Sequence, residues 1–122
     1  VASLKKLAIP VNMHCHGKVR HAMSRMIEMG IDATDPVEPP PAGDVTYEEA
    51  RSIAAGRLTL VGNFEWDELT SLEPDRIRER VREILSHGTR RVILSASAGP
   101  NTYISERTAE NYRALIDEAL HA

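Results

Sequence analysis

The stretch LTLVGNFEWDELTSLEPDRIRERVREILSHGTRRVILSA, residues 58–96, carries the alternation on which the fold depends. Its first part, 58–62, is a short apolar run that ends in glycine, which predicts a strand. The segment 74–86 begins with proline and predicts a helix, because its apolar residues have the spacing of one buried helical face: Ile77, Val81, Ile84 and Leu85. A second apolar run follows at 92–94. This order of strand, helix and strand predicts parallel pairing with a right-handed crossover.

The same alternation extends over the rest of the chain. Two further strands are predicted at 7–13 and 31–37. Three further helices are predicted, over 18–29, from the capping-box pair Thr46 and Glu49 to Gly56, and from about Thr108 onward. A loop at 99–101 follows the last strand. The final helix is expected to turn one apolar face inward: Ala109, Tyr112, Leu115, Ile116, Ala119 and Leu120.

The predicted fold class is α/β, with four β-α units in a single domain over residues 1–122. Four such units make the C-terminal half of an eight-unit (β/α)8 TIM barrel, which typically takes roughly 250 residues. A half barrel alone would expose two strand edges and a concave apolar face. We therefore expect a fragment or subunit of a larger barrel, covered by an N-terminal half barrel or by a second copy in a homodimer. The start at Val1 rather than methionine favours the same expectation.

Composition limits the classes of partner. The formal net charge of −3 and the pI near 5.9 give no electrostatic reason to expect nucleic acid or an anionic membrane. Cys15 is the single cysteine, so no internal disulfide can form, and no apolar run reaches the length of about 18 residues that a membrane span needs. We expect a cytoplasmic protein that binds a small-molecule substrate.

Each predicted strand runs into a polar cluster: His14 and His16, Asp35 and Glu38, Asn63 and Glu65, and Ser95 and Ser97. The carboxyl ends of parallel strands are where barrel enzymes place their chemistry. We therefore expect these clusters to share one rim of the sheet.

A zinc site is one hypothesis for this rim. Alternation along a strand puts His14 and His16 on one face, and Glu38, next to the rigid proline loop at 39–41, could add a carboxylate. Two imidazoles and a carboxylate suit zinc with an open coordination position, at which a bound thiol or water would become a nucleophile. The alternative is a metal-free, hydrogen-bonded histidine pair that binds substrate carboxylates when protonated.

Catalytic roles are predicted for Glu38, Asn63 and Glu65. The Asn63 amide could orient a substrate, or it could cap the turn that follows its strand. Glu38 could equally be a surface residue of the proline loop.

Several segments carry a resemblance to a known family: VNMHCHGK at 11–18, VGN at 61–63 followed by a Glu-rich helix start, and AEN at 109–111. With the intervening sequence, they resemble the C-terminal half of the uroporphyrinogen decarboxylase superfamily over nearly the whole chain. The resemblance implies a (β/α)8 barrel. It also implies one of two activities, because the superfamily includes cofactor-free tetrapyrrole decarboxylases and zinc-dependent methyltransferases that pass a methyl group between a corrinoid and a thiol.

The chain departs from the pattern of both enzyme types in this family. The methyltransferases end the first strand of this region in His-x-Cys and carry another cysteine after the last strand, whereas this chain has His14-x-His16 and Ala98. The decarboxylases hold the porphyrinogen with residues of the N-terminal half, and carry His-Gly where this chain has Ala98-Gly99. We expect a methyltransferase-type enzyme with zinc and a corrinoid protein as partner. The alternatives are a uroporphyrinogen decarboxylase-type fragment and a catalytically inactive binding or assembly module.

Overall fold

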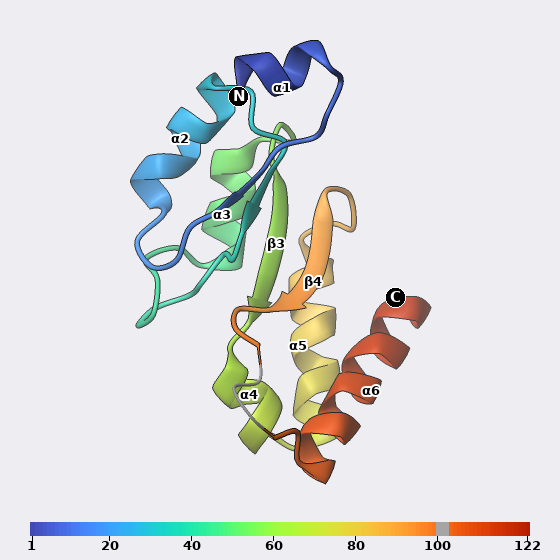
Figure 1. The fold of residues 1–122 in the computed structure, drawn as a ribbon. Coiled ribbons are helices and arrows are strands. Elements are labelled where there is room, and N and C mark those ends of the chain that lie inside the picture. The colour runs from blue at the N-terminus through green and yellow to red at the C-terminus, as the bar shows by residue number, and fades with distance from the viewer. Residues whose placement is uncertain (100–102) are drawn as a thin grey trace.

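The computed structural model describes residues 1–99 and 103–122, so most of the predicted loop at 99–101 lies outside it. Helices and strands alternate along the chain (Figure 1). The elements are, in order, α1 (Ala2–Lys6), β1 (Asn12–His14), α2 (Arg20–Glu28), β2 (Ala33–Asp35), α3 (Tyr47–Ala54), β3 (Thr59–Phe64), α4 (Trp66–Ser71), α5 (Pro74–Ser86), β4 (Val92–Ala96) and α6 (Glu106–His121).

The four strands form one parallel sheet in the order β1-β2-β3-β4. Consecutive strands are neighbours, as expected when each crossover has the same hand. The predicted α/β class and the parallel pairing are therefore confirmed. Helices α3 and α5 lie behind the sheet in the view of Figure 1.

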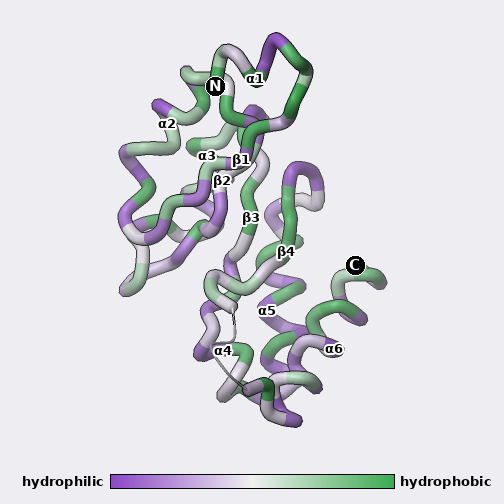
Figure 2. The backbone as a smooth tube through the Cα atoms, viewed as in Figure 1, coloured by the Kyte–Doolittle hydropathy of each residue, from purple (hydrophilic) through white to green (hydrophobic). Residues whose placement is uncertain are grey.

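One face of the sheet forms the core with the helices. Parallel register aligns Met13, Thr34, Leu60 and Val92 in one row across the sheet, and Thr34 and Leu60 are fully buried. The helices bury the stripes that their spacing predicts: Met23 and Met26 from α2, Tyr47, Ala50 and Ala54 from α3, and Ile77, Val81 and Ile84 from α5. Figure 2 shows the resulting apolar colour along β4, with hydrophilic colour at the turn that precedes it.

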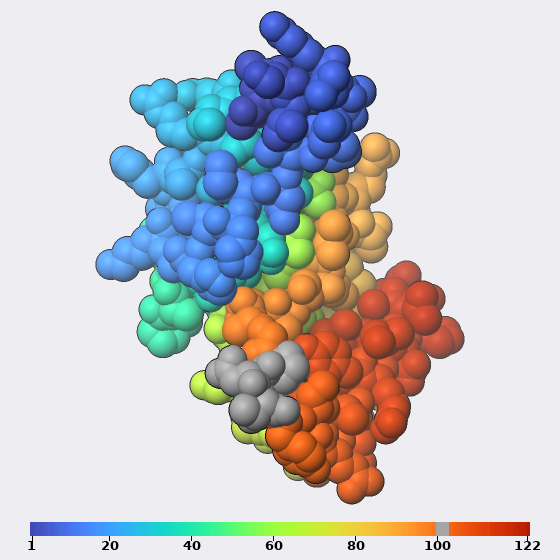
Figure 3. Space-filling view, in the orientation of Figure 1, coloured from blue at the N-terminus to red at the C-terminus, as the bar shows by residue number. Residues whose placement is uncertain are grey.

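The adjacent row of strand residues faces away from this core. His14 aligns with Asp35, and Val61 aligns with Ile93, whose side chain is 52% exposed. In the space-filling view, β4 lies at the surface between the N-terminal segment and α6 (Figure 3). This open face is the one on which the histidines sit.

Local sequence signals set the element ends. Thr46 and Glu49 form the predicted capping box, with Thr46 Oγ1 accepting from the Glu49 amide and Glu49 Oε2 accepting from the Thr46 amide. The predicted helix at 74–86 is confirmed with the same bounds, and it begins with proline at its first position.

The short helix α1 was not predicted, because five residues contain too few turns to show a helical period. Helix α4 was expected only as a Glu-rich helix start after residue 63. The inward orientation of the last helix was partly wrong. Ile116 is 51% exposed and Leu120 is 77% exposed. Helix α6 instead packs on α4 and α5 through the row Thr108, Asn111, Ala114 and Leu115, so its other apolar side is left uncovered. Within the described ranges, none of these helices has the length and apolarity to cross a lipid bilayer.

Candidate functional site

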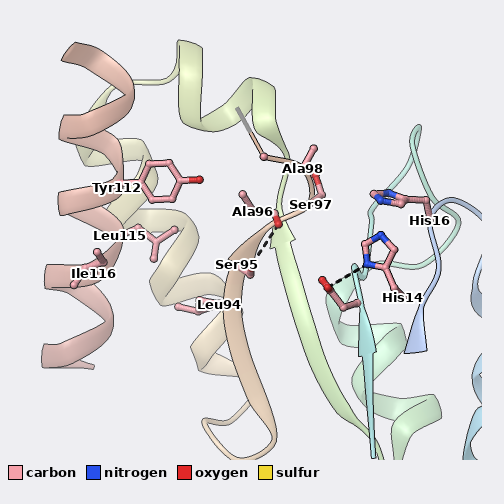
Figure 4. Close-up of a pocket in the computed structure, with 12 residues that line it drawn as sticks. His14, His16, Leu94, Ser95, Ala96, Ser97, Ala98, Tyr112, Leu115 and Ile116 are labelled. Carbon is pink, nitrogen blue, oxygen red and sulfur yellow. Dashed lines mark hydrogen bonds and ion pairs between the residues drawn. The ribbon is translucent and has the colours of Figure 1, made fainter. Parts of the chain in front are cut away.

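A pocket of about 720 Å³ opens at the carboxyl ends of the strands (Figure 4). Its polar lining comes from β1, β2 and β4, and its apolar lining comes mainly from β4 and α6. The polar side chains are His14, His16, Asp35, Ser95 and Ser97, and the apolar ones include Leu94, Tyr112, Leu115 and Ile116. The predicted rim therefore exists, and both histidines reach it.

His14 is the last residue of β1, and its ring pairs with the last residue of β2. The strand register places His14 opposite Asp35, and His14 Nδ1 lies 3.3 Å from Asp35 Oδ2. The pair is open to solvent, with side-chain exposures of 63% for His14 and 28% for Asp35. This contact fixes the ring loosely, since it is long and open to water.

His16 makes a shorter contact with a buried carboxylate. His16 Nδ1 lies 2.9 Å from Glu38 Oε1, and the Gly17 amide donates to Glu38 Oε2 over 2.6 Å. Glu38 is 7% exposed, so its proposed surface position is wrong and its predicted place beside the histidines is right. Gly17 has a φ of +82°, a backbone conformation that suits glycine and turns its amide toward the carboxylate.

The two imidazoles lie side by side. Their ring centroids are 4.8 Å apart, with an interplanar angle of 80°. Each ring uses Nδ1 for a carboxylate, so Nε2 is the nitrogen left over from these contacts. Cys15, between them in the sequence, packs against the core instead, as alternation predicts.

Asn63 lies near the carboxyl end of β3 but lines a different pocket, and its amide is held by protein groups. Its Nδ2 donates to the Val37 carbonyl over 2.8 Å, and its Oδ1 accepts from Arg80 Nη2 over 3.3 Å. The residue is 1% exposed. These bonds tie the segment after β2 to β3 and to α5, and a substrate-orienting role for Asn63 stays a prediction.

Glu65 follows β3 and lies next to the pocket wall. Ser97, which lines the pocket, donates its hydroxyl to Glu65 Oε2 over 3.1 Å. Burial raises the pKa of Glu65, the Ser97 bond lowers it, and the negative charges of Glu38, Glu68 and Asp67 raise it further. Glu65 therefore holds its proton to a higher pH than a free glutamate does.

The donor set fits a metal ion in part. A histidine that ligates a metal through Nε2 usually donates its Nδ1 proton to a carboxylate, which is the arrangement at both His14 and His16. However, within residues 1–99 and 103–122, no group of three or more His, Cys, Asp or Glu side chains is arranged to hold a metal ion. In this geometry the two oxygens of Glu38 face His16 and the Gly17 amide, and a role for Glu38 as a third zinc ligand stays a prediction.

The contacts of three residues at or near the site were not predicted from the sequence: Asp35, Ser97 and Arg80. Asp35 and Ser97 were predicted only as polar residues at strand ends. Asp35 contacts His14 and Ser97 contacts Glu65, and both contacts depend on the strand register, which the sequence alone does not reveal. Arg80 was not among the predicted site residues. It bonds Glu68 and Glu83, its side chain is only 21% exposed, and it also reaches Asn63.

Comparisons with known proteins place the chain among relatives. One solved structure that it resembles is a methyltransferase from Methanosarcina mazei, with a TM-score of 0.67 and 23% sequence identity. The match covers 98% of this chain and 34% of that one, so the chain spans about a third of that methyltransferase. At this identity, the likeness shows the fold alone. No curated protein matches the chain.

A family model gives the relationship directly. The model described as uroporphyrinogen decarboxylase (URO-D) matches residues 1–121, which is nearly the whole chain. The predicted resemblance is thereby confirmed, and the chain belongs to the uroporphyrinogen decarboxylase (URO-D) family.

Proposed function

We propose that this chain is the half-barrel portion of a methyltransferase-type member of its family, and that His14 and His16 hold a zinc ion. The observation that carries the proposal is the pairing of each imidazole Nδ1 with its own carboxylate, which leaves the Nε2 atoms of two histidines that line one pocket available as donors. The fold shared with the methyltransferase from Methanosarcina mazei supports the same assignment.

Zinc bound here would lower the pKa of a thiol substrate and so supply a thiolate nucleophile. The chain's own groups position the reactants. Asp35 and Glu38 hold the two rings, and Ser95 and Ser97 leave room at the end of β4 for a ligand. Glu65, whose pKa is raised by burial, accepts the hydroxyl of Ser97 at the pocket wall. The methyl donor in this proposal is a corrinoid protein.

A third zinc ligand is needed beside the two histidines. Ala98 stands near the pocket where the family's methyltransferases carry a cysteine. Glu38, the predicted third ligand, lies beside His16 and keeps a second lone pair on each oxygen. A substrate thiol can occupy an open coordination position.

We further propose that the four-stranded sheet is half of an eight-stranded barrel that other strands complete. Strand β4 has a free edge beside the exposed side chain of Ile93. On α6, Ile116 and Leu120 expose an apolar side next to it. An N-terminal half barrel would bury these side chains, and a second copy of the chain is the alternative. We place the assembled protein in the cytoplasm, in keeping with its single cysteine.

Zinc uptake by the chain, purified without a histidine tag, tests the proposal. We expect close to one zinc ion per wild-type chain, and loss of binding in His16→Ala. His21, an exposed histidine of α2, gives the matched control His21→Ala, which should keep the zinc. Less than about a tenth of an equivalent in folded wild-type protein would refute the zinc assignment.

Activity assays separate the remaining functions. Methyl transfer from a methylated corrinoid to a thiol, lost in His16→Ala, is the expected result. Formation of coproporphyrinogen from uroporphyrinogen would support a decarboxylase-type enzyme instead, as the name of the matching family model suggests. Inactivity in both assays, together with a stable complex with another chain, would support the binding or assembly module.

A further inference from the structure

Glu38 is a buried carboxylate in contact with His16, which lines the pocket. It is 7% exposed, and its two oxygens have different partners. Oε1 faces His16 Nδ1 at 2.9 Å, and Oε2 accepts from the Gly17 amide at 2.6 Å. A backbone amide is only a donor, so the atom at the Oε2 position must be an acceptor.

An ionised carboxylate accepts hydrogen bonds and cannot donate them. The contact with Oε1 therefore requires the proton of neutral His16 to lie on Nδ1, which leaves the lone pair on Nε2. We propose that Glu38 is a positioning residue that locks His16 in the Nδ1–H tautomer and so presents Nε2 to the pocket as a lone-pair donor. It does this without itself contacting the ligand.

The Gly17 amide makes the tautomer of His16 depend on which atom stands at the Oε1 position of residue 38. In Glu38→Gln, the side-chain oxygen must face the Gly17 amide, so the NH2 group takes the place of Oε1. The NH2 group donates, and His16 Nδ1 must then accept. The proton moves to Nε2, and the lone pair that faced the pocket is lost. A substitution that changes neither size nor shape thus inverts the donor pattern of His16.

The neighbouring pair provides an internal comparison. The distance from His14 Nδ1 to Asp35 Oδ2 is longer, at 3.3 Å, and both side chains are more exposed than Glu38. Water can replace either partner there, so Asp35→Asn should leave the tautomer of His16 unchanged.

The inference about the tautomer of His16 does not require zinc; only the use of Nε2 as a zinc ligand rests on the proposed function. If His16 binds zinc through Nε2, Glu38→Gln should weaken zinc affinity by about 10–100-fold, the usual effect of removing the partner of a metal-binding histidine. Asp35→Asn should weaken it less, because the His14 contact is longer and more exposed.

The test is ¹⁵N NMR of the imidazoles in metal-free protein at about pH 8.5, two units above the ordinary pKa of an imidazole. His16→Asn assigns the His16 signals among the five histidines of the chain. We expect the Nδ1–H pattern for His16 in the wild type and in Asp35→Asn, and the Nε2–H pattern in Glu38→Gln.

An Nε2–H pattern in the wild type would overturn the proposal, and this measurement needs no variant to fold. An unchanged Nδ1–H pattern in folded Glu38→Gln would also overturn it. The two proposals fail separately: the expected tautomers without zinc uptake would refute the zinc site alone, and zinc uptake with the wrong tautomer would refute the role of Glu38 alone.

Discussion

Asn111 is a buried amide whose loss should measurably destabilise the fold. It is 0% exposed on α6, and its Nδ2 donates to the carbonyls of Leu69 and Leu72, at 3.0 and 2.8 Å. These carbonyls belong to the end of α4, where a helix leaves its last acceptors without internal partners. A single amide therefore connects α6 to the end of α4.

Asn111→Ala removes both bonds. Each buried carbonyl left without a donor costs about 1–3 kcal/mol, but the bond to Leu72 is only partly buried, so water recovers some of that loss. Asn111 Oδ1 is itself buried with no partner among the described residues, and the variant relieves that cost. We therefore expect a net loss of about 2–3 kcal/mol in the free energy of unfolding.

Urea unfolding followed by circular dichroism measures this change. Arg113→Ala, at an exposed position on the same helix, is the control and should stay within about 0.5 kcal/mol of the wild type. Asn111→Asp should cost more than Asn111→Ala, because it places a carboxylate against two carbonyl oxygens. A loss below about 1 kcal/mol in Asn111→Ala would show that this contact does not hold α6 to α4.

Three further changes should alter stability, each measured by urea unfolding. Because burial raises the pKa of Glu65, the stabilisation from this group is present below the ordinary value of 4.5 and is lost as the pH rises through the folded-state pKa. Glu65→Gln keeps an oxygen for Ser97, and its free energy of unfolding should therefore rise relative to that of the wild type towards neutral pH. Parallel pH profiles of the two proteins would contradict this. Gly62→Ala should cost about 1–3 kcal/mol, because φ is +129° and the new Cβ would lie 3.1 Å from the Val37 nitrogen; a neutral effect would show that β3 relaxes there. Thr46→Ala should cost about 1 kcal/mol through loss of the capping box, and no change in the unfolding midpoint would mean that water replaces the cap.

The sequence predicted most of the fold because its strongest signals are local. The helix at 74–86 and the cap at Thr46 depend on spacing within a few residues, and both are confirmed. The orientation of α6 depends on what lies across from it, which spacing does not reveal. Hence Ile116 and Leu120 were assigned inward although no described element covers them.

The candidate site was predictable as a location but not as a set of contacts. Strand ends meet at one edge of a parallel sheet, which placed Glu38 beside His16 correctly. The sequence could not show that the Gly17 amide claims one oxygen of Glu38, because that bond depends on a single turn with positive φ. It also could not show that Arg80 satisfies the Asn63 amide from a neighbouring helix.

The two imidazoles and their carboxylates all come from residues 14–38, whereas the uncovered apolar side is built after residue 92. The two regions meet at Ile116, which is exposed on α6 and also lines the pocket of the histidines. A chain that covered this apolar side would therefore also close one wall of the pocket, so that assembly and access to the histidines would be linked.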